Sequence, residues 1–154
     1  MDKVIRGEKH FTASVWIITD SSPKKVLLIN HKKLGRWLQL GGHIEKFENP
    51  IIAVIREAKE ESGVDISFLA EKIRAADDET NFLPKPVYLV EQFIPEYQDT
   101  PQHFHLDMQY VVEIEEQELK QSMQESKGIG WFTKKEALKL TIHEDTKIIL
   151  DKLL

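Results

Sequence analysis

The order of its segments predicts a mixed α/β protein, with helices packed on a central mixed β-sheet. β-rich segments come first at 11–19 and 26–30, one helical segment follows at 50–62, and further β-rich segments precede two short helical ones. Strands that surround one helix and precede others are typical of a sheet covered by helices. We find no internal repeat, low-complexity tract or flexible linker, so residues 1–154 are expected to form a single domain.

The helix predicted at 50–62 has clear signals at both ends. Asn49 is a favoured N-cap, Pro50 fits the first helical position, and Gly63 suits the position after the last turn. The apolar residues between them recur at helical spacing, and we expect this face to pack on the sheet.

The later segments are assigned from β-rich composition and from the turn residues between them. We expect strands at 65–76, 86–94, 103–114 and 128–132.

Two capping boxes are predicted after the last strand. Thr133 with Glu136 would begin a short helix, and Thr141 with Glu144 would begin a helix that closes the chain at Leu154.

Composition restricts the class of protein. The net charge is −5, from 26 acidic and 21 basic residues, which disfavours a general nucleic-acid-binding surface. There are no cysteines, which excludes disulfides, zinc–thiolate sites and thiol nucleophiles. The N-terminus lacks the apolar segment of a signal peptide, and the longest apolar runs are too short to cross a bilayer. We therefore expect a cytoplasmic protein without a membrane partner.

Three glutamates near the end of the predicted helix form what we call the glutamate cluster: Glu57, Glu60 and Glu61. Side chains three and four residues apart are neighbours on a helix, and like charges there cost about 0.2–0.5 kcal/mol per pair. The negative end of the helix dipole adds to this cost. Clustered carboxylates suit Mg²⁺ or Mn²⁺, which bridge to substrate phosphates. The cluster is therefore either a solvated helix face or a divalent-cation site.

The segment GHIEKFENPIIAVIREAKEESGV, residues 42–64, resembles the Nudix box of the Nudix hydrolases. That motif is Gly, five residues, Glu, seven residues, then Arg-Glu-apolar-x-Glu-Glu-x-Gly-apolar. At ordinary residue usage, its seven fixed positions would match by chance about once in 10⁸ to 10⁹ starts, which favours the cation site. All seven are matched here, and the two apolar positions are filled as well: Gly42, Glu48, Arg56, Glu57, Glu60, Glu61 and Gly63, with Ala58 and Val64.

The resemblance implies a Nudix-type α/β/α sandwich with a central mixed β-sheet. It also implies hydrolysis of a pyrophosphate bond in a nucleoside diphosphate linked to another moiety. Phosphoryl chemistry needs neutralisation of phosphate charge and an in-line water, and a metal held by acidic side chains assists both. One departure is Leu40, because the family often has Pro before the glycine pair.

The resemblance also assigns roles around the metal. It implies Mg²⁺, with Mn²⁺ as the alternative, bound by the glutamate cluster and by the backbone carbonyl of Gly41. We expect Arg56 to orient one of these carboxylates through a charge-assisted hydrogen bond. Glu48 either supports the structure or contacts the metal through water. The general base varies within the family, and the candidates are Glu61, Asp107 and Glu125.

The resemblance leaves the substrate open. Residue 79 is Glu rather than the proline that marks many ADP-ribose hydrolases, and we find no other subfamily motif. Nucleoside triphosphates, nucleotide sugars and other small-molecule pyrophosphates remain, and homodimer formation is open. Two other functions are weighed: a non-catalytic Nudix-like module that senses a nucleotide, and an enzyme like the isoprenyl diphosphate isomerases. The intact glutamates disfavour the first, and the absence of cysteine disfavours the second.

Two further segments are candidates for substrate contacts. Segment 103–114 alternates polar and apolar residues, so its polar row faces either solvent or the metal cleft, and we favour the cleft. The segment HKKLGRW at 31–37, which contains Arg36, is either a solvated loop or a contact for an anionic substrate. The polar row consists of His103, His105, Asp107 and Gln109.

Overall fold

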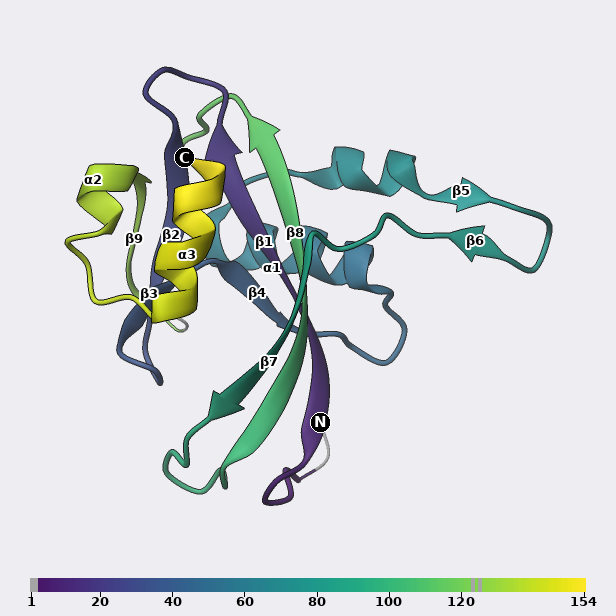
Figure 1. Cartoon of the computed structure of the whole chain (residues 1–154). Helices are drawn as coiled ribbons and strands as arrows, with labels where there is room; N and C mark the ends of the chain where they lie inside the picture. The colour runs from purple at the N-terminus through teal and green to yellow at the C-terminus, as the bar shows by residue number, and fades with distance from the viewer. Residues whose placement is uncertain (1–2, 123, 125) are drawn as a thin grey trace.

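The computed structural model describes residues 3–122, 124 and 126–154 (Figure 1). In chain order its elements are β1 (Lys9–Thr19), β2 (Lys25–His31), β3 (Arg36–Leu38), β4 (Leu40–His43), α1 (Pro50–Ser62), the 3₁₀ helix η1 (Ser67–Lys72), β5 (Arg74–Ala75), β6 (Asn81–Phe82), β7 (Tyr88–Ile94), β8 (His103–Ile114), β9 (Ser126–Thr133), α2 (Lys134–Ala137) and α3 (Glu144–Leu153).

The main sheet is mixed, as predicted, and it is organised around β1. This strand runs parallel to β8 along its whole length, from the pair Lys9 and Phe104 to the pair Thr19 and Ile114. It also pairs antiparallel with β2 near its end and with β4 nearer its start. β7 pairs with β8, and both β3 and β9 pair with β2, so seven strands of the described chain share one sheet.

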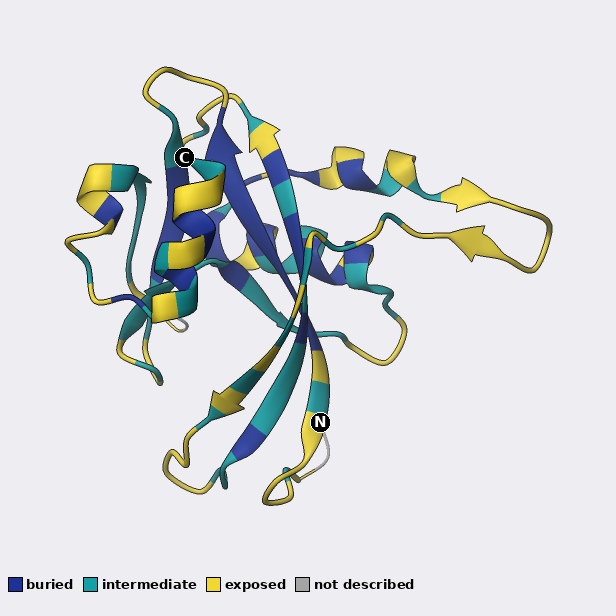
Figure 2. Cartoon of the chain, in the orientation of Figure 1, coloured by how far each residue is buried: buried dark blue, intermediate teal, exposed yellow. Residues whose placement is uncertain are grey.

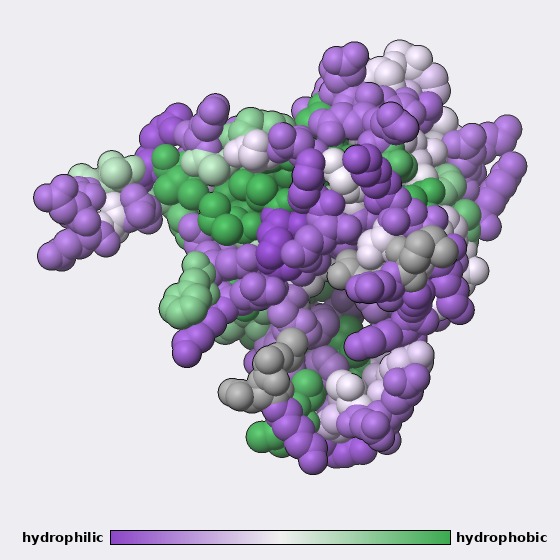
Figure 3. Space-filling view, turned by 180° about the vertical axis from the view of Figure 1, so that it is seen from behind, coloured by the Kyte–Doolittle hydropathy of each residue, from purple (hydrophilic) through white to green (hydrophobic). Residues whose placement is uncertain are grey.

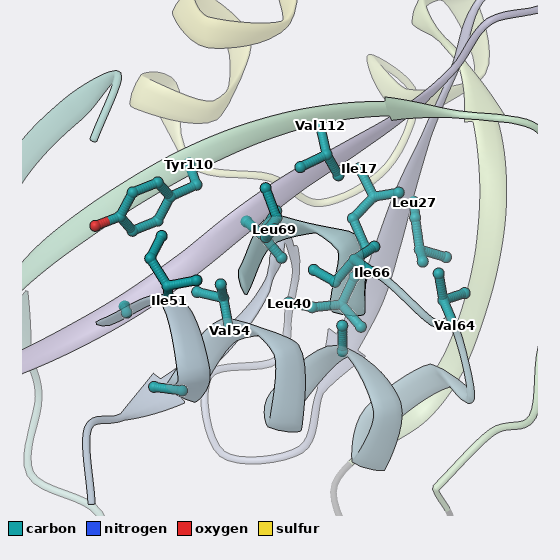
Figure 4. Packing of buried hydrophobic residues seen from close by; sticks show 14 of the residues in the cluster. Ile17, Leu27, Leu40, Ile51, Val54, Val64, Ile66, Leu69, Tyr110 and Val112 are labelled. Atoms are coloured by element: carbon teal, nitrogen blue, oxygen red, sulfur yellow. The ribbon is translucent and has the colours of Figure 1, made fainter. Parts of the chain in front are cut away.

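Helices cover both faces of this sheet, so the fold is an α/β/α sandwich. Successive side chains of a strand point to opposite faces. Val15 and Ile17 of β1 pack with α1 in one core, whereas Trp16 and Ile18 pack with α3 in the other. Figure 4 shows the first core, in which Ile51 of α1 points towards the sheet. Figure 2 shows buried residues concentrated where helices and sheet meet.

The ends of α1 confirm the helix predicted at 50–62. Asn49 Oδ1 accepts a hydrogen bond from the Ile52 backbone N–H at 3.0 Å. The chain leaves the helix at Gly63, whose φ of 75° lies in the left-handed region that favours glycine. Leu40 is fully buried in the core beneath α1, so this departure from the family pattern adds apolar packing.

The strand predicted at 65–76 is confirmed only near its end, where Arg74–Ala75 forms β5, and is wrong for the rest of the segment. Asp65 Oδ1 accepts a hydrogen bond from the Ser67 N–H at 2.8 Å, a local bond that turns the chain into η1. Ile66 and Leu69 are both buried in the α1 core, and a spacing of three suits a 3₁₀ helix rather than a strand. The hairpin of β5 and β6 follows, projecting from the body in Figure 1, and its β6 falls within a predicted loop.

The C-terminal helices agree in part with the prediction. The first capping box is confirmed, because the Glu136 N–H donates to Thr133 Oγ1 and the Thr133 N–H donates to Glu136 Oε2. The second is wrong: α3 begins at Glu144 without a side-chain cap. The Thr141 carbonyl instead accepts a hydrogen bond from the Trp37 N–H at 2.9 Å, which keeps this segment extended against β3.

The strands predicted at 11–19, 26–30, 86–94, 103–114 and 128–132 are confirmed, with ends that move by a few residues. Among the described residues, no helix has the length and apolar composition needed to cross a membrane.

Candidate active site

Side chains from β1, β4, β7, β8 and α1 enclose a cavity of about 500 Å³, together with the loops after β2 and β7. Figure 3 shows that the back of the molecule is hollowed between its main body and the end formed by β1, β7 and β8. Hydrophilic residues surround most of this hollow, whereas a hydrophobic area lies beside the base of the β5–β6 hairpin.

Two members of the glutamate cluster line this cavity. Glu61 is only 4% exposed, and its Oε1 accepts a hydrogen bond from the Gly41 N–H at 2.8 Å. Glu57 also lies in the cavity wall. Glu60 is outside the wall, and its side chain is 49% exposed. The helix therefore presents two carboxylates to the cavity beside the backbone of Gly41, with the third on the solvent side.

The glycine pair allows this close approach of strand and helix. A Cβ atom on Gly41 would lie 2.5 Å from the Ala13 carbonyl oxygen and 2.6 Å from Ser14 Cα. A Cβ atom on Gly42 would lie 2.5 Å from Glu57 Oε1. At Gly41 the short distances are to backbone atoms, so only glycine lets β4 approach β1 this closely, whereas a Cβ atom at Gly42 would displace the carboxylate of Glu57.

Arg56 connects the glutamate cluster to the loop before α1. Its Nη1 donates to Glu57 Oε1 at 2.8 Å and to Glu60 Oε2 at 3.2 Å. Its Nη2 donates to the His43 carbonyl at 3.1 Å. The neighbouring carboxylates, Glu48 first among them, raise the pKa of Arg56 further. The geometry agrees with the expected orienting role of Arg56, since one guanidinium fixes two carboxylates of the cluster.

Glu48 holds Arg56 in this position. Its two carboxylate oxygens accept from Arg56 Nε at 2.6 Å and from Nη2 at 3.0 Å, a bidentate pair. Its Oε2 also accepts from the Glu45 N–H at 3.0 Å. The hydrogen bond from Arg56 lowers the pKa of Glu48. Glu48 does not line the cavity, so these contacts favour structural support over a water-mediated metal contact.

Three of the four residues in the polar row of β8 face the cavity, whereas Gln109 does not line it and accepts a hydrogen bond from Trp16 Nε1. His103, His105 and Asp107 all line the cavity. Asp107 is 6% exposed and accepts three hydrogen bonds: from Thr12 Oγ1 at 2.8 Å, from Ser14 Oγ at 2.7 Å, and from Gln109 Nε2 at 3.0 Å. These donors engage both oxygens, so Asp107 fixes β8 to the polar face of β1.

Sequence reasoning missed two histidines of the site. His10 of β1 and His43 of β4 meet His103 and His105 of β8, and we call these four the histidine cluster. His10 Nδ1 lies 3.2 Å from His43 Nε2, and the Nε2 atoms of His103 and His105 are also 3.2 Å apart. The alternation His10, Thr12, Ser14 in β1 was the available signal, because it parallels the polar row of β8.

Burial sets the charge of these rings. Burial first, and the neighbouring histidines second, lower the pKa of His43 to about 4 and that of His105 to about 3. Both rings are therefore neutral at pH 7.

The other predicted contacts are divided between the cavity and its surroundings. Lys32 and Lys33 of the segment 31–37 line the cavity, whereas Arg36 does not, so a substrate contact by Arg36 stays a prediction. Tyr97 lines the cavity from the loop after β7. Glu125 lies outside the described residues.

Comparisons with known proteins agree with this architecture. A NUDIX-family hydrolase from Clostridium perfringens is 29% identical in sequence, with a TM-score of 0.70 over 93% of this chain and 94% of that one. The E. coli dihydroneopterin triphosphate pyrophosphohydrolase shares the fold at 18% identity, with a TM-score of 0.60 over 96% of this chain and 97% of that one.

A curated relative is also similar in sequence. The "Probable DHNTP pyrophosphohydrolase" of Lactococcus lactis subsp. cremoris (strain MG1363) is 33% identical over 94 residues, which are 61% of this chain. This chain spans about half of that relative, 49% of its length.

The family assignment rests on nearly the whole chain. The sequence profile of the NUDIX domain matches residues 8–153, which include every element of the sandwich and both clusters at the cavity. The chain belongs to the NUDIX domain family.

Proposed function

We propose that this protein hydrolyses a pyrophosphate bond in a nucleoside diphosphate linked to another moiety, with Mg²⁺ or Mn²⁺ as its cofactor. The observation that carries the proposal is the placement of Glu57 and Glu61 on the cavity wall beside Gly41. Oxygen donors gathered at a polar cavity suit hard divalent cations, which retain water and bridge to phosphates. The bound cation would neutralise phosphate charge and acidify a water.

The residues of the box would hold these donors in place. The Gly41 N–H fixes the carboxylate of Glu61, and Arg56 fixes that of Glu57. Glu60 shares Arg56 with Glu57, which keeps it in the same cluster as the third acidic ligand. The Gly41 carbonyl is the proposed fourth protein ligand.

We favour Glu61 over Asp107 as the general base. Asp107 already accepts three hydrogen bonds from side chains of β1 and β8, so its oxygens are committed to the wall of the cavity. Glu61 lies on the cavity wall next to Gly41, where a carboxylate can reach a water that attacks a bound phosphate.

The remaining cavity surface suits a phosphate chain joined to a flat ring. Lys32 and Lys33 supply positive charge for phosphates. Tyr97, Ile94 and Leu38 supply apolar surface on which a heterocycle would pack. The names of two similar proteins refer to dihydroneopterin triphosphate, so this compound belongs among the substrates tested with nucleoside triphosphates and nucleotide sugars.

The test is a substrate screen that measures release of phosphate and pyrophosphate with Mg²⁺, with Mn²⁺ and with excess EDTA. We expect hydrolysis of at least one compound with either ion and none in EDTA. Activity that survives complete chelation would contradict the metal-dependent mechanism. No turnover of any compound, combined with tight nucleotide binding, would instead support the non-catalytic sensing module. A cytoplasmic location and homodimer formation stay predictions.

A further inference from the structure

The histidine cluster assembles through the pairing of strands rather than through a local motif. His10 is the direct partner of His105 in the parallel pairing of β1 and β8. His43 pairs with Thr12, two residues after His10, on the other side of β1. One ring nitrogen from each of His10, His43 and His105 lies within 4.8 Å of the others. We propose that these three histidines form a second metal site, which binds a borderline ion of the Zn²⁺ type.

The spacing of the ring nitrogens suits one small ion. Zn²⁺ binds histidine nitrogen at about 2.0–2.1 Å, so two nitrogens on a tetrahedral ion are about 3.3 Å apart. His10 Nδ1 and His43 Nε2 are 3.2 Å apart, close to that value. His105 approaches from β8, which lies on the other side of β1 from His43. Its ring is edge-on to the ring of His43, at a centroid distance of 4.9 Å. A small rotation of His105 would complete a three-nitrogen site.

The partners of these rings fix which nitrogen faces the ion. His10 Nε2 lies 2.9 Å from Glu8 Oε2, so this nitrogen carries the proton and Nδ1 is left for the metal. A carboxylate that holds the second nitrogen is the usual outer partner of a metal-binding histidine. His103 Nδ1 lies 2.9 Å from the Pro101 carbonyl, which requires a proton there and directs Nε2 towards His105. His103 is thus a positioning residue for His105.

The chemistry of the set selects the ion. All three donors are imidazole nitrogens, which suit Zn²⁺, Co²⁺ and Ni²⁺ better than Mg²⁺. Burial keeps His43 and His105 neutral, which is the form that binds metal. Three protein ligands leave a fourth position for water or for a phosphate oxygen, as in zinc sites that take part in reactions. His43 and His105 line the cavity, so that position would be accessible to the proposed substrate.

The site goes beyond the proposed hydrolysis and does not depend on it, so its test measures metal binding. The metal-free protein is titrated with Co²⁺ in excess Mg²⁺, which would compete with Co²⁺ at the proposed oxygen ligands of the glutamate cluster. We expect one equivalent of Co²⁺ with the intense visible absorption of four-coordinate nitrogen-rich cobalt, and displacement by Zn²⁺. Weak absorption, typical of six-coordinate oxygen ligands, would overturn the proposal.

Variants locate the ion. His43→Ala and His105→Ala should each abolish the four-coordinate spectrum, and Glu8→Gln should weaken affinity about 10- to 100-fold. His143→Ala is the matched control, because His143 lines the same cavity outside the cluster, and it should bind as the wild type does. Unchanged binding in both alanine variants would refute the site.

Two further measurements keep the result decisive. Glu61→Gln should retain Co²⁺ binding, whereas loss of binding there would assign the ion to the glutamate cluster. If an alanine variant does not fold, X-ray absorption of the Zn²⁺-loaded wild type counts the imidazole ligands directly. Three imidazoles would support the site, and an oxygen-dominated shell would refute it. Because hydrolysis enters neither measurement, failure of the proposed function would leave these outcomes unaffected.

Discussion

Residues of both the glutamate cluster and the histidine cluster line one cavity, but the two clusters are held in different ways. The glutamates come from successive turns of one helix, and Arg56 bridges Glu57 and Glu60. The histidines come from three strands and contact one another through ring nitrogens, while Glu8 supports His10 from outside. The glutamate cluster is therefore ordered by one helix and the guanidinium of Arg56, and the histidine cluster by the register in which three strands pair.

The two clusters also differ in charge. The hydrogen bond from Arg56 lowers the pKa of Glu48, the carboxylate that holds Arg56 beside the glutamate cluster. Burial instead keeps His43 and His105 uncharged. The cavity thus offers anionic oxygen donors on one side and neutral nitrogen donors on the other. Such a pair of donor sets would distinguish a hard cation from a borderline one.

Glu61→Gln should produce the largest functional effect. The amide oxygen can still accept from the Gly41 N–H, but the variant loses the negative charge and the proposed base. Turnover should fall by about 10²- to 10⁴-fold, the usual contribution of a general base. Steady-state kinetics on the substrate found by the screen, with saturating Mg²⁺, measure this.

The control for this variant is Glu71→Gln, an exposed glutamate on η1 that lies outside the cavity. It should have wild-type kinetics. In the metal-free state Glu61→Gln should melt at or slightly above the wild-type temperature, because it removes one like charge from the cluster. A large fall in its melting temperature would mean that Glu61 is mainly structural.

Arg56→Lys should reduce activity through the glutamate cluster while leaving the metal-binding rings of the histidine cluster in place, because Arg56 contacts His43 at its backbone carbonyl and not at a ring nitrogen. Lysine cannot reproduce the bidentate pair with Glu48 together with the bond to Glu57. Loss of such charge-assisted hydrogen bonds costs about 1.5–3 kcal/mol. We expect turnover to fall at least tenfold and the Mg²⁺ requirement to rise, with Co²⁺ binding by the histidines unchanged. An equal loss of Mg²⁺-dependent turnover and of Co²⁺ binding would show that the two clusters are not independent.

The glutamate cluster could be predicted because its geometry is local. A helix places residues three and four apart side by side, so the spacing of Glu57, Glu60 and Glu61 already defines one face. The caps at Asn49 and Gly63 define the helix itself. The unequal exposure of the three carboxylates could not be predicted, because it depends on how α1 lies against β4.

The histidine cluster could not be predicted in the same way. Alternation places His103 and His105 on one face, but no local rule pairs His10 with His105 across β1 and β8. A register shift of one residue would turn the row to the other face of the sheet. The error at 65–76 has a similar origin, because an Asx turn at Asp65 and burial of Leu69 outweigh β-rich composition.

Asp107→Asn tests the polar network beneath the histidines. An amide in place of the carboxylate puts an NH₂ group opposite at least one donor from Thr12, Ser14 or Gln109. A buried mispaired group costs about 1–3 kcal/mol, so we expect a lower free energy of unfolding in urea titrations. Turnover per folded molecule should stay within about tenfold of wild type. This limit means that the substitution raises the activation free energy of the proposed reaction by less than about 1.4 kcal/mol. Full stability combined with lost turnover would instead make Asp107 the base.

The smallest expected effect separates the histidine cluster from the Arg56–Glu48 pair by pH. His43 has a folded-state pKa of about 4, below the ordinary 6.5, so the unfolded state binds more protons between these values. Stability is therefore fully present above pH 6.5 and is lost as the pH falls towards 4. The pKa of Glu48 is lowered from 4.5, so its contribution is present above pH 4.5 and is lost only below it.

Melting temperatures of the metal-free protein between pH 7.5 and 3.5 test this separation. His43→Gln should flatten the profile between pH 6.5 and 4. The corresponding change in the free energy of unfolding is on the order of 1 kcal/mol, after allowance for the partial exposure of His43. Glu48→Gln should leave that interval unchanged and flatten the profile below pH 4.5. The contribution of His43 is lost first as the pH falls, because burial penalises its protonation, whereas the hydrogen bond from Arg56 keeps the Glu48 carboxylate ionised to lower pH. Identical profiles for the two variants would show that one titrating network, not two, controls the cavity.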